Sequence, residues 1–382
     1  MPARFGGVER HVEGLATELV QHGFDITVYA RRWYTPKEVR SVHGVNIVHL
    51  PTVHTKHLDA IVHTFLATIH AMANRFDVVH YHGVGPSLLS WIPRIFTPHI
   101  RVITTFHSID RKHKKWGVFA RCALRIGEWS ACRFAHETIA VSQTIRQYAR
   151  DLYDRDARYI PNALSPMKKS TQTDTLAQWG VEPGSYMLMV SRLVPHKGFH
   201  YAIEAWKRAT ADSASPLKNK KLVIVGDGYY TDTYVRELRQ LAQGREDIVF
   251  TGSQSGEALV QLYSHAFGFV HPSENEGLPM VVLEAMSYGL SIFLSDIPEH
   301  RDVILKETRF FPAGSVEAIE KAFCVLAQLS PEERATEGAA HRRMIQERYE
   351  WSKVLASIVE VYKSSVQPVT IQVPFQAGID RG

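Results

Sequence analysis

Short apolar runs alternate with longer amphipathic segments along almost the whole chain. The short runs are rich in β-branched residues, and the longer segments repeat their apolar positions at helical spacing, a pattern typical of βα units around a parallel sheet. The runs that predict strands are 26–30, 45–50, 78–82, 102–106, 138–141 and 158–160, then 186–190, 222–225, 248–250, 267–270, 291–294 and 310–311. The segments that predict helices are 8–22, 58–74, part of 117–134, 143–153, 199–209, 230–243, 256–263, 280–288, 316–329, 331–348 and 351–364.

A break in this alternation divides the chain into two halves. Residues 161–183 are rich in Pro, Ser, Thr and Lys and lack a regular pattern, which is typical of a domain boundary. The full length of 382 residues also exceeds what one hydrophobic core usually supports. We therefore predict an α/β protein of two doubly wound lobes, 1–163 and 164–349, followed by a helix at 350–365 and a mobile tail at 366–382. In such sheets ligands bind at the carboxyl ends of the strands.

Composition adds a charge asymmetry to this picture. Residues 1–165 contain 21 Lys and Arg against 13 Asp and Glu, a net +8, whereas the remainder contains 23 against 26, a net −3; together they make the +5 of the whole chain. A basic first half predicts an anionic partner or surface, without choosing between nucleic acid, phospholipid and a phosphorylated substrate. No apolar stretch is long enough for a membrane span, and the first residues carry early charges, unlike a secretion signal. The three cysteines show no disulfide or metal spacing, so we expect a cytoplasmic protein.

The most informative motif follows the apolar run at 267–270. It places Glu276 in a loop and Glu284 inside the next helix, with seven residues between them and Pro279 near the first helical turn. Carboxylates accept strong hydrogen bonds from hydroxyl-rich ligands, so a sugar or a ribose is a natural partner. Helix capping by Glu276 and a solvent-exposed Glu284 would explain the same residues.

Two further motifs follow predicted strands or precede predicted helices. Arg192 and Lys197 come directly after the run at 186–190, where a guanidinium and a mobile ammonium suit a diphosphate, although solvated charges beside a turn are equally ordinary. Gly6 and Gly7 lead into the first predicted helix, where backbone amides can approach a phosphate closely; a plain turn remains the alternative.

Together these motifs resemble the retaining family 4 glycosyltransferases, which have the GT-B fold of two facing Rossmann-like lobes. The resemblance extends from about Phe5 to Ser364. Its segments are GGVER at 6–10, TFHS at 105–108, IAVS at 139–142, IPNAL at 160–164, SRLVPHKG at 191–198, VGDG at 225–228, FTGS at 250–253, EGLP and LEA at 276–285, and LSDIPEH at 294–300. The general character is that of bacterial enzymes that build cell-surface polysaccharides.

The resemblance implies a division of roles. The first lobe would bind a saccharide or lipid-linked acceptor and the second a nucleotide-sugar donor, with the helix at 350–365 crossing back to the first lobe. Arg192 and Lys197 would bind the donor diphosphate, Glu284 the ribose hydroxyls and Glu276 a hydroxyl of the transferred sugar. Gly277 and Leu278 would support phosphate or sugar through their backbone amides, Gly7 would let its loop close on the donor, and His107 would contact the sugar. It implies no cofactor, no metal requirement and no nucleic-acid partner, and it leaves the donor base, the sugar and the acceptor open.

One departure from the family concerns the beginning of the chain. Family members begin with a central β-strand that delivers the glycine loop, whereas only five residues precede Gly6 here. We therefore expect the first lobe to lack its first strand, which would leave a gap between neighbouring strands. This departure keeps two alternatives open beside the glycosyltransferase: a nucleotide-sugar epimerase on the same fold, and a truncated binding protein without catalysis.

Two groups of side chains have less certain roles. His80 and His82 alternate on one predicted strand as metal ligands do, but no third ligand has suitable spacing along the chain, so strand-end packing is the preferred interpretation. Residues 111–133 mix basic side chains with Trp116, Phe119, Ile126 and Trp129. That segment suits peripheral contact with the anionic inner face of a membrane, a packed helix with a solvated basic face, or an anionic acceptor.

Overall fold

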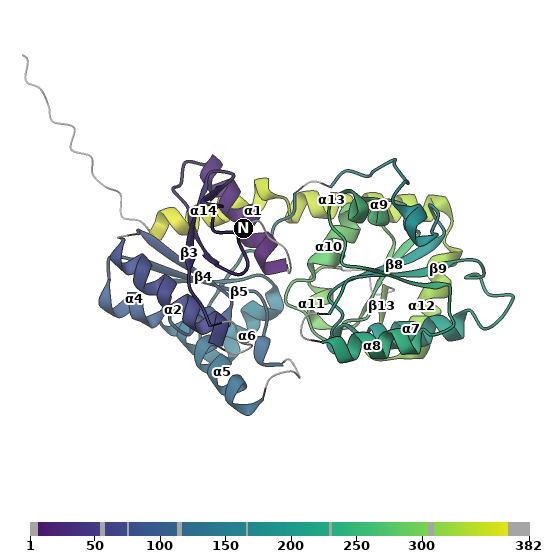
Figure 1. Ribbon diagram of the computed structural model, residues 1–382, viewed down its shortest axis with the longest axis horizontal. Helices are drawn as coiled ribbons and strands as arrows, with labels where there is room; N and C mark the ends of the chain where they lie inside the picture. The colour runs from purple at the N-terminus through teal and green to yellow at the C-terminus, as the bar shows by residue number, and fades with distance from the viewer. Residues whose placement is uncertain are drawn as a thin grey trace, which may run out of the picture.

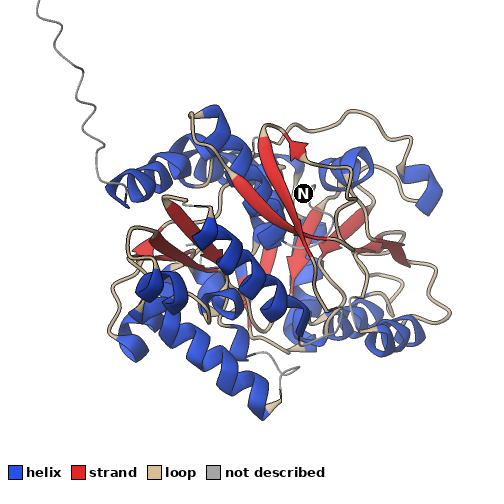
Figure 2. Cartoon of the chain, turned by 60° about the vertical axis from the view of Figure 1, so that its left-hand side comes forward, coloured by secondary structure: helices blue, strands red, loops and turns tan. Residues whose placement is uncertain are grey.

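The computed structural model describes residues 7–53, 58–74, 76–112, 117–165, 167–228, 231–304 and 309–365. Two α/β lobes lie side by side in it, the N-terminal lobe at the left of Figure 1 and the C-terminal lobe at the right. Helices surround the strands of both lobes, as Figure 2 shows. The arrangement follows from the sequence pattern, because each apolar run must be covered on both faces by the amphipathic helices beside it.

The C-terminal lobe is built on one six-stranded parallel sheet in the order β10-β9-β8-β11-β12-β13. These strands are β8 (Tyr186–Val190), β9 (Lys221–Val225), β10 (Ile248–Gly252), β11 (Gly268–His271), β12 (Ile292–Ser295) and β13 (Phe310–Phe311). The helices are α7 (Phe199–Ala209), α8 (Asp232–Leu241), α9 (Gly256–His265), α10 (Met280–Ser287), α11 (Pro298–Arg301), α12 (Val316–Gln328) and α13 (Pro331–Arg348). The lobe's first strand, β8, is completely buried and lies in the middle of the sheet.

The strands of the N-terminal lobe fall into two sheets. One has the order β1-β3-β2 and the other β4-β5-β6-β7. The strands are β1 (Thr27–Arg31), β2 (Ser41–Val42), β3 (Val45–Leu50), β4 (Val78–His82), β5 (Arg101–Phe106), β6 (Glu137–Ala140) and β7 (Arg158–Tyr159). The helices are α1 (Gly7–Gln21), α2 (Leu58–Ala73), α3 (Val84–Ser87), α4 (Trp91–Phe96), α5 (Val118–Arg133) and α6 (Gln143–Tyr153).

Comparison of the lobes shows where the N-terminal sheet is interrupted. In the C-terminal lobe β8 joins β9 to β11, whereas among the described residues no strand joins β1 to β4. The described strands of this lobe therefore form two separate sheets. Residues 1–6, on which the expectation of a missing strand depends, lie outside the described residues, and so does the tail at 366–382.

The last helix belongs in space to the N-terminal lobe. Helix α14 (Trp351–Ser365) buries Trp351, Leu355 and Ile358 in a cluster with Leu15 of α1 and Ile103 of β5. Before it, the chain crosses between lobes where the Leu164 amide donates to the Tyr349 carbonyl over 2.7 Å. The chain therefore passes between the lobes twice, at Leu164 and at Tyr349, and these crossings lie side by side.

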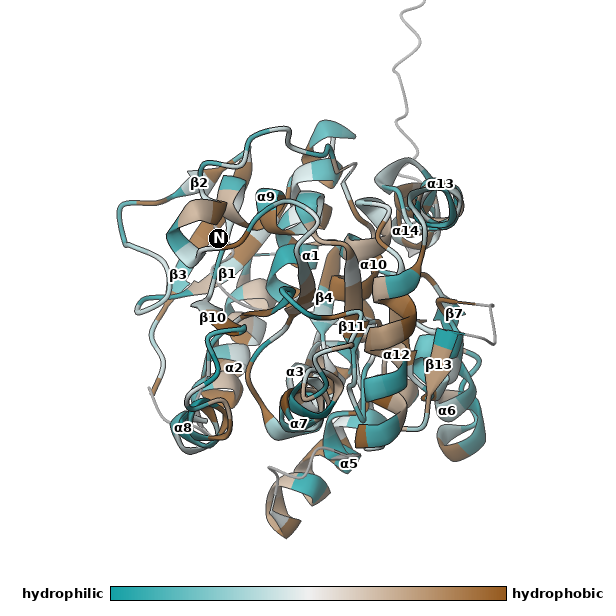
Figure 3. Cartoon of the chain, turned by 90° about the vertical axis from the view of Figure 1, so that its right-hand side faces the viewer, coloured by the Kyte–Doolittle hydropathy of each residue, from teal (hydrophilic) through white to brown (hydrophobic). Residues whose placement is uncertain are grey.

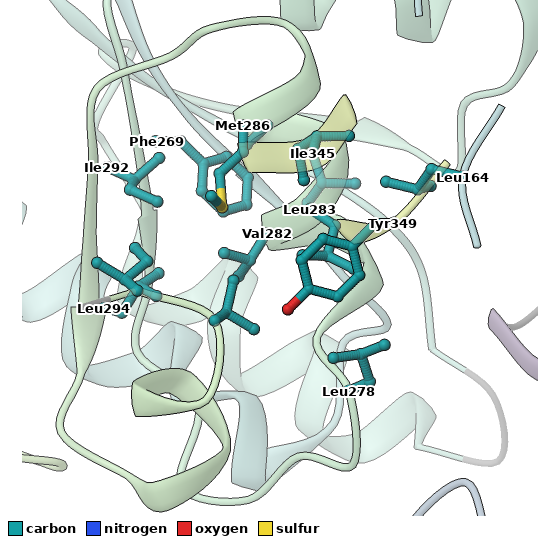
Figure 4. Packing of buried hydrophobic residues seen from close by; sticks show 14 of the residues in the cluster. Leu164, Phe269, Leu278, Val282, Leu283, Met286, Ile292, Leu294, Ile345 and Tyr349 are labelled. Carbon is teal, nitrogen blue, oxygen red and sulfur yellow. The ribbon is translucent and has the colours of Figure 1, made fainter. Parts of the chain in front are cut away.

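Helix α10 links the core of the C-terminal lobe to the carboxyl edge of its sheet. Figure 4 shows Val282, Leu283 and Met286 of α10 beside Phe269 and Leu294 of the sheet. Ile345 of α13 and Tyr349, the residue after α13, cover the helix from the other side. Because the helix is fixed on both sides, its N-terminal end and Glu284 have a defined position relative to β11.

Candidate active site

The loop after β8 is held at the carboxyl edge of the sheet by a close backbone contact. A Cβ at Gly226 would lie 1.8 Å from the Ser191 carbonyl oxygen, and Gly226 has a φ of 143°. Only glycine allows both the conformation and the approach. The Leu193 amide then donates to the Asp227 carbonyl over 2.9 Å. This contact explains why the short VGDG segment accompanies the Arg192 loop.

The two basic residues of that loop differ in burial. Lys197 lies in the 3₁₀ turn Pro195–Lys197 and is buried, and its Nζ donates to Glu276 Oε1 over 2.5 Å. Arg192 is exposed, and its guanidinium has no hydrogen bond to the part of the chain that the structure describes. Thus one cation is fixed at the base of the site and the other is free to reach a ligand.

Glu276 is buried but remains a carboxylate. Burial raises its pKa, but the Lys197 ammonium and a hydrogen bond from His271 outweigh that effect, so the pKa lies well below its ordinary value. His271 Nε2 lies 2.7 Å from the same Oε1. Burial lowers the pKa of His271, so its ring is neutral at pH 7 and donates its N–H to the carboxylate. Both contacts fall on Oε1, which leaves Oε2 to accept a ligand hydroxyl.

Glu284 projects from α10 and is held by two partners from different lobes. Tyr263 of α9 donates to Glu284 Oε2 over 2.9 Å, and Arg10 of α1 donates to Oε1 over 3.3 Å. Burial raises the pKa of Glu284, while Arg10 and the Tyr263 hydroxyl oppose the rise. The alternative of a solvent-exposed Glu284 is therefore wrong, because the carboxylate is buried at the junction of the lobes.

The lobes touch at Gly277. A Cβ on this residue would lie 1.7 Å from the His107 carbonyl oxygen, at the end of β5. Gly7, at the start of α1, lies beside Met280 of α10, since its Cβ would be 3.4 Å from Met280 Cγ. Leu278 packs into the core below. Gly277 and Glu284 of the second lobe thus meet the elements that carry Gly7, Arg10 and His107 in the first along one interlobe seam, and Lys197 is tied to it through Glu276.

His107 is one of four histidines on the N-terminal side of this seam. Its Nε2 lies 3.1 Å from His82 Nδ1, and the ring of His11 packs edge-on against it at 5.3 Å between centroids. His80 lies against His82, with ring centroids 4.0 Å apart. Burial lowers the pKa of His11 to about 3 and that of His82 to about 4, and it holds the pKa values of His80 and His107 well below 6.5.

Four residues of the site were not singled out from the sequence. Arg10, His11 and Tyr263 reach it from elements remote from the Glu276 motif, whereas His271 ends β11, five residues before Glu276. Along the chain, no third metal ligand has suitable spacing from His80 and His82. In the folded protein, however, α1 brings His11 close to His82, and the end of β5 brings His107 close to it. Arg10 and His11 directly follow the glycine loop in the same α1 helix, which was the one signal that could have drawn attention to them.

The arrangement combines groups suited to an anion and to hydroxyl-bearing ligands. Lys197 and Arg192 offer positive charge, and Glu276 and Glu284 offer carboxylate acceptors. His107 offers a neutral imidazole from the opposite lobe. Among the described residues, every helix is too short or too polar to span a bilayer.

Comparison with known proteins agrees with this architecture. Residues 5–167 match the family model "Glycosyltransferase Family 4" and residues 173–343 match "Glycosyl transferases group 1". An uncharacterized glycosyltransferase of Methanocaldococcus jannaschii is 24% identical, with 96% of each chain covered. The phosphatidyl-myo-inositol mannosyltransferase of Mycobacterium leprae is 27% identical over 78% of each chain.

Solved structures show the same fold at low sequence identity. Anabaena HepE in complex with UDP-glucose superposes with a TM-score of 0.79 at 18% identity, covering 94% of this chain and 97% of that one. The sucrose-phosphate synthase of Thermosynechococcus elongatus has a TM-score of 0.80 at 18% identity, covering 94% and 93%. The fold is therefore GT-B, and with the two family models matched in tandem along nearly its whole length, the chain belongs to the family 4 glycosyltransferases.

Proposed function

We propose that the protein transfers a sugar from a nucleotide-diphosphate donor bound in the C-terminal lobe to an acceptor bound on the N-terminal lobe. The observation that carries this proposal is the buried Lys197–Glu276 pair, which adjoins Gly277, the residue whose backbone touches the His107 carbonyl of the other lobe. Glu284 accepts the ribose hydroxyls, and Arg192 and Lys197 bind the diphosphate. Glu276 Oε2 and neutral His107 bind hydroxyls of the transferred sugar. The UDP-glucose found in the structurally similar HepE supports this class of donor.

The chemistry follows from where charge develops. The bond between the anomeric carbon and the β-phosphate oxygen breaks, the acceptor oxygen bonds to that carbon, and the acceptor proton passes to the departing phosphate. Arg192 and Lys197 stabilise the growing negative charge of the leaving group. We propose that the cationic pair takes the place of a metal ion, so that transfer proceeds in EDTA. We also propose retention of anomeric configuration, with attack on the face that the phosphate leaves.

Nucleotide binding tests the donor site directly. UDP, GDP, ADP and dTDP are titrated into the protein by calorimetry with EDTA present. One diphosphate should bind, and Glu284→Ala and Lys197→Ala should each weaken it by about tenfold or more, since each removes a charge-assisted hydrogen bond. Glu317→Ala and Lys321→Ala serve as matched controls, because both side chains are exposed on α12. If all four variants bind like the parent, the assignment of the donor site is wrong.

Product analysis separates transfer from the alternatives. The sugar form of the selected nucleotide is incubated with and without candidate saccharide and lipid-linked acceptors. Transfer predicts a glycosylated product that forms only with acceptor and that keeps the donor's anomeric configuration by NMR. Sugar epimerisation without acceptor would support the epimerase instead. Nucleotide binding without turnover of any acceptor would support a binding protein.

The raised pKa of Glu284 predicts a pH dependence of nucleotide affinity. A carboxyl whose pKa is raised takes up its proton at a higher pH than a free glutamate, so lowering the pH neutralises it early. The ionised form is the stronger acceptor for ribose hydroxyls. The parent should bind the nucleotide about tenfold more tightly than Glu284→Gln at pH 7.5, and this ratio should shrink as the pH is lowered and the Glu284 carboxyl takes up its proton. Both proteins are measured with the same nucleotide, so protonation of the nucleotide itself affects both affinities equally and cancels in their ratio. A ratio that grows as the pH falls would contradict the role of Glu284.

A surface on the N-terminal lobe supports a membrane-associated acceptor. At the free end of α5, Val118 and Phe119 are 81% and 93% exposed, and Ile126 and Trp129 are exposed along the same helix. The exposed cations Arg121, Arg125 and Arg133 lie among them. Figure 3 shows apolar and polar residues side by side at this tip. Trp116 lies outside the described residues.

The second half of α5 is anchored next to the seam. Gly127 packs against the Val84 carbonyl, which its Cβ would approach to 2.3 Å. Buried Glu128 accepts hydrogen bonds from Arg111, Tyr148 and Tyr153. The exposed end therefore projects from a fixed base close to β4, whose last residue is His82. We propose that this end of α5 contacts an anionic membrane and brings the lobe to a lipid-linked acceptor for surface polysaccharide or glycolipid synthesis.

Vesicle sedimentation tests the membrane contact. The protein should pellet with vesicles that contain phosphatidylglycerol and much less with pure phosphatidylcholine, and added salt should weaken the binding. Phe119→Asp should lower the affinity about tenfold, because an inserted apolar side chain is replaced by a charge repelled from the surface. Val325→Asp changes an exposed apolar residue of the other lobe and should have no effect. Equal loss in both variants would show that α5 is not the contact.

A further inference from the structure

Three histidines from three elements converge beside the seam. His11 comes from α1, His82 from the end of β4 and His107 from the residue after β5, and one ring nitrogen of each lies within 4.8 Å of the others. His82 Nδ1 and His107 Nε2 are already 3.1 Å apart. Tetrahedral Zn²⁺ with bonds of about 2.0–2.1 Å needs ligand nitrogens about 3.3–3.4 Å apart. Small rotations of the rings would therefore bring all three to one ion.

The chemical state of the cluster suits metal binding. Burial lowers the pKa values of all three imidazoles, so they are neutral at pH 7, which is the form that binds metals. Nδ1 of His11 is buried and has no hydrogen-bond partner among the described residues. Leaving a buried polar atom unpaired is costly, and an ion could satisfy it.

His80 supports the cluster without joining it. Its two ring nitrogens are engaged by Tyr362 Oη and Thr105 Oγ1, each at 2.7 Å. Its ring lies against that of His82 and limits how His82 can turn. A ring fixed in this way keeps the His82 nitrogen directed at the other two histidines.

A second group of residues has similar spacing but different electrostatics. His271, Glu276 and His300 also lie close enough to share an ion. The Lys197 ammonium already occupies Glu276 Oε1 at 2.5 Å, and it would repel a cation. His300 Nδ1 donates to the Ser295 carbonyl over 2.8 Å, and its Nε2 is buried without a partner among the described residues, so the Lys197 ammonium is what distinguishes this group from the first. Among the described residues, no lysine or arginine contributes to the lowered pKa values of His11, His82 and His107, whereas Lys197 contributes to those of His271 and His300, so the first group is the better site.

We propose that His11, His82 and His107 form a binding site for a divalent transition-metal ion of the Zn²⁺ type, and that occupation of this site inhibits sugar transfer. Three imidazoles favour such ions over Mg²⁺ or Ca²⁺, which prefer oxygen ligands. Inhibition follows because a metal-bound His107 cannot contact the transferred sugar. The inhibitory effect rests on the proposed function, whereas metal binding does not. The site is compatible with transfer in EDTA, because the ion opposes the reaction and is not required by it.

Metal binding is tested first, without reference to activity. Untagged protein is stripped with EDTA, which is then removed, and Zn²⁺ is titrated by calorimetry. Co²⁺ is added separately, because tetrahedral nitrogen coordination gives it a distinct visible spectrum. The parent should bind one ion and show that spectrum. His11→Gln and His82→Gln should each weaken Zn²⁺ binding by more than about tenfold and lose the spectrum.

Matched variants distinguish this site from others. His22→Gln and His99→Gln change exposed histidines and should bind like the parent. His300→Gln tests the second group and should also keep the ion. Thermal melting confirms that each variant is folded. Absence of the Co²⁺ spectrum in the parent, or loss of the ion only in His300→Gln, would overturn the proposed site; the parent measurement stands even where a variant fails to fold.

Inhibition is measured once a donor and acceptor are known. Zn²⁺ should lower the parent's transfer rate at least about tenfold, and EDTA should restore it. When the same Zn²⁺ is added to His11→Gln or His82→Gln, each variant should keep most of the transfer rate that it shows in EDTA. Zn²⁺ that binds the three histidines without slowing transfer would overturn the inhibitory role and leave the donor site unaffected. Failure of the proposed function is recognised separately, since it would abolish transfer in EDTA as well.

Discussion

The architecture depends on one close contact between the lobes, where Gly277 meets the carbonyl of His107. Any side chain at position 277 would overlap that oxygen, with a Cβ only 1.7 Å away. The contact brings the loop after β11 against the end of β5, so groups from two separate sheets share one seam. The connections at Leu164 and Tyr349 and the packing of α14 on α1 hold the lobes in register around it. A reaction between groups on two lobes requires a fixed distance between those groups, because even a small misplacement lowers the reaction rate.

On the C-terminal side of the seam, neighbouring side chains of the protein compensate the buried charge of the glutamates. Lys197 and His271 keep Glu276 ionised despite its burial, whereas burial raises the pKa of Glu284. The pKa values of two carboxylates of the same motif are therefore shifted in opposite directions. Arg10 adds a cation to Glu284 from the other lobe. On the N-terminal side of the seam, burial keeps four histidines neutral.

Much of the fold could be predicted from periodicity. The strands 45–50, 78–82 and 186–190 and the helices 143–153 and 199–209 have exactly the predicted bounds, because alternation of apolar runs and amphipathic segments is strong there. The short elements β2, α3, α4 and α11 were not predicted, because they lack both a run of strongly apolar strand residues, such as the two phenylalanines of β13, and enough length for a helical repeat. The boundaries elsewhere shift by a residue or two, where caps and local hydrogen bonds decide the ends.

The site was predictable only where its residues lie in one motif. Glu276, Glu284, Arg192 and Lys197 follow strands that a parallel sheet brings to one edge. Two contacts depend on how the lobes and strands pack, which local sequence does not encode. One is the pairing of Arg10 with Glu284, and the other is the cluster of His11, His82 and His107. Sequence also could not show that Lys197 is buried against Glu276 while Arg192 is exposed, because both are basic residues of the same loop.

The central claim is that the Gly277–His107 contact places the N-terminal lobe over the donor, and the rate of sugar transfer by Gly277→Ala tests it most directly. The added methyl must push the lobes apart, so the account predicts a loss of about 100-fold in kcat with a much smaller change in nucleotide affinity. Gly85→Ala is the control, because a Cβ there meets nothing within 4 Å. A Gly277→Ala protein that transfers sugar at the parent's rate would contradict the account.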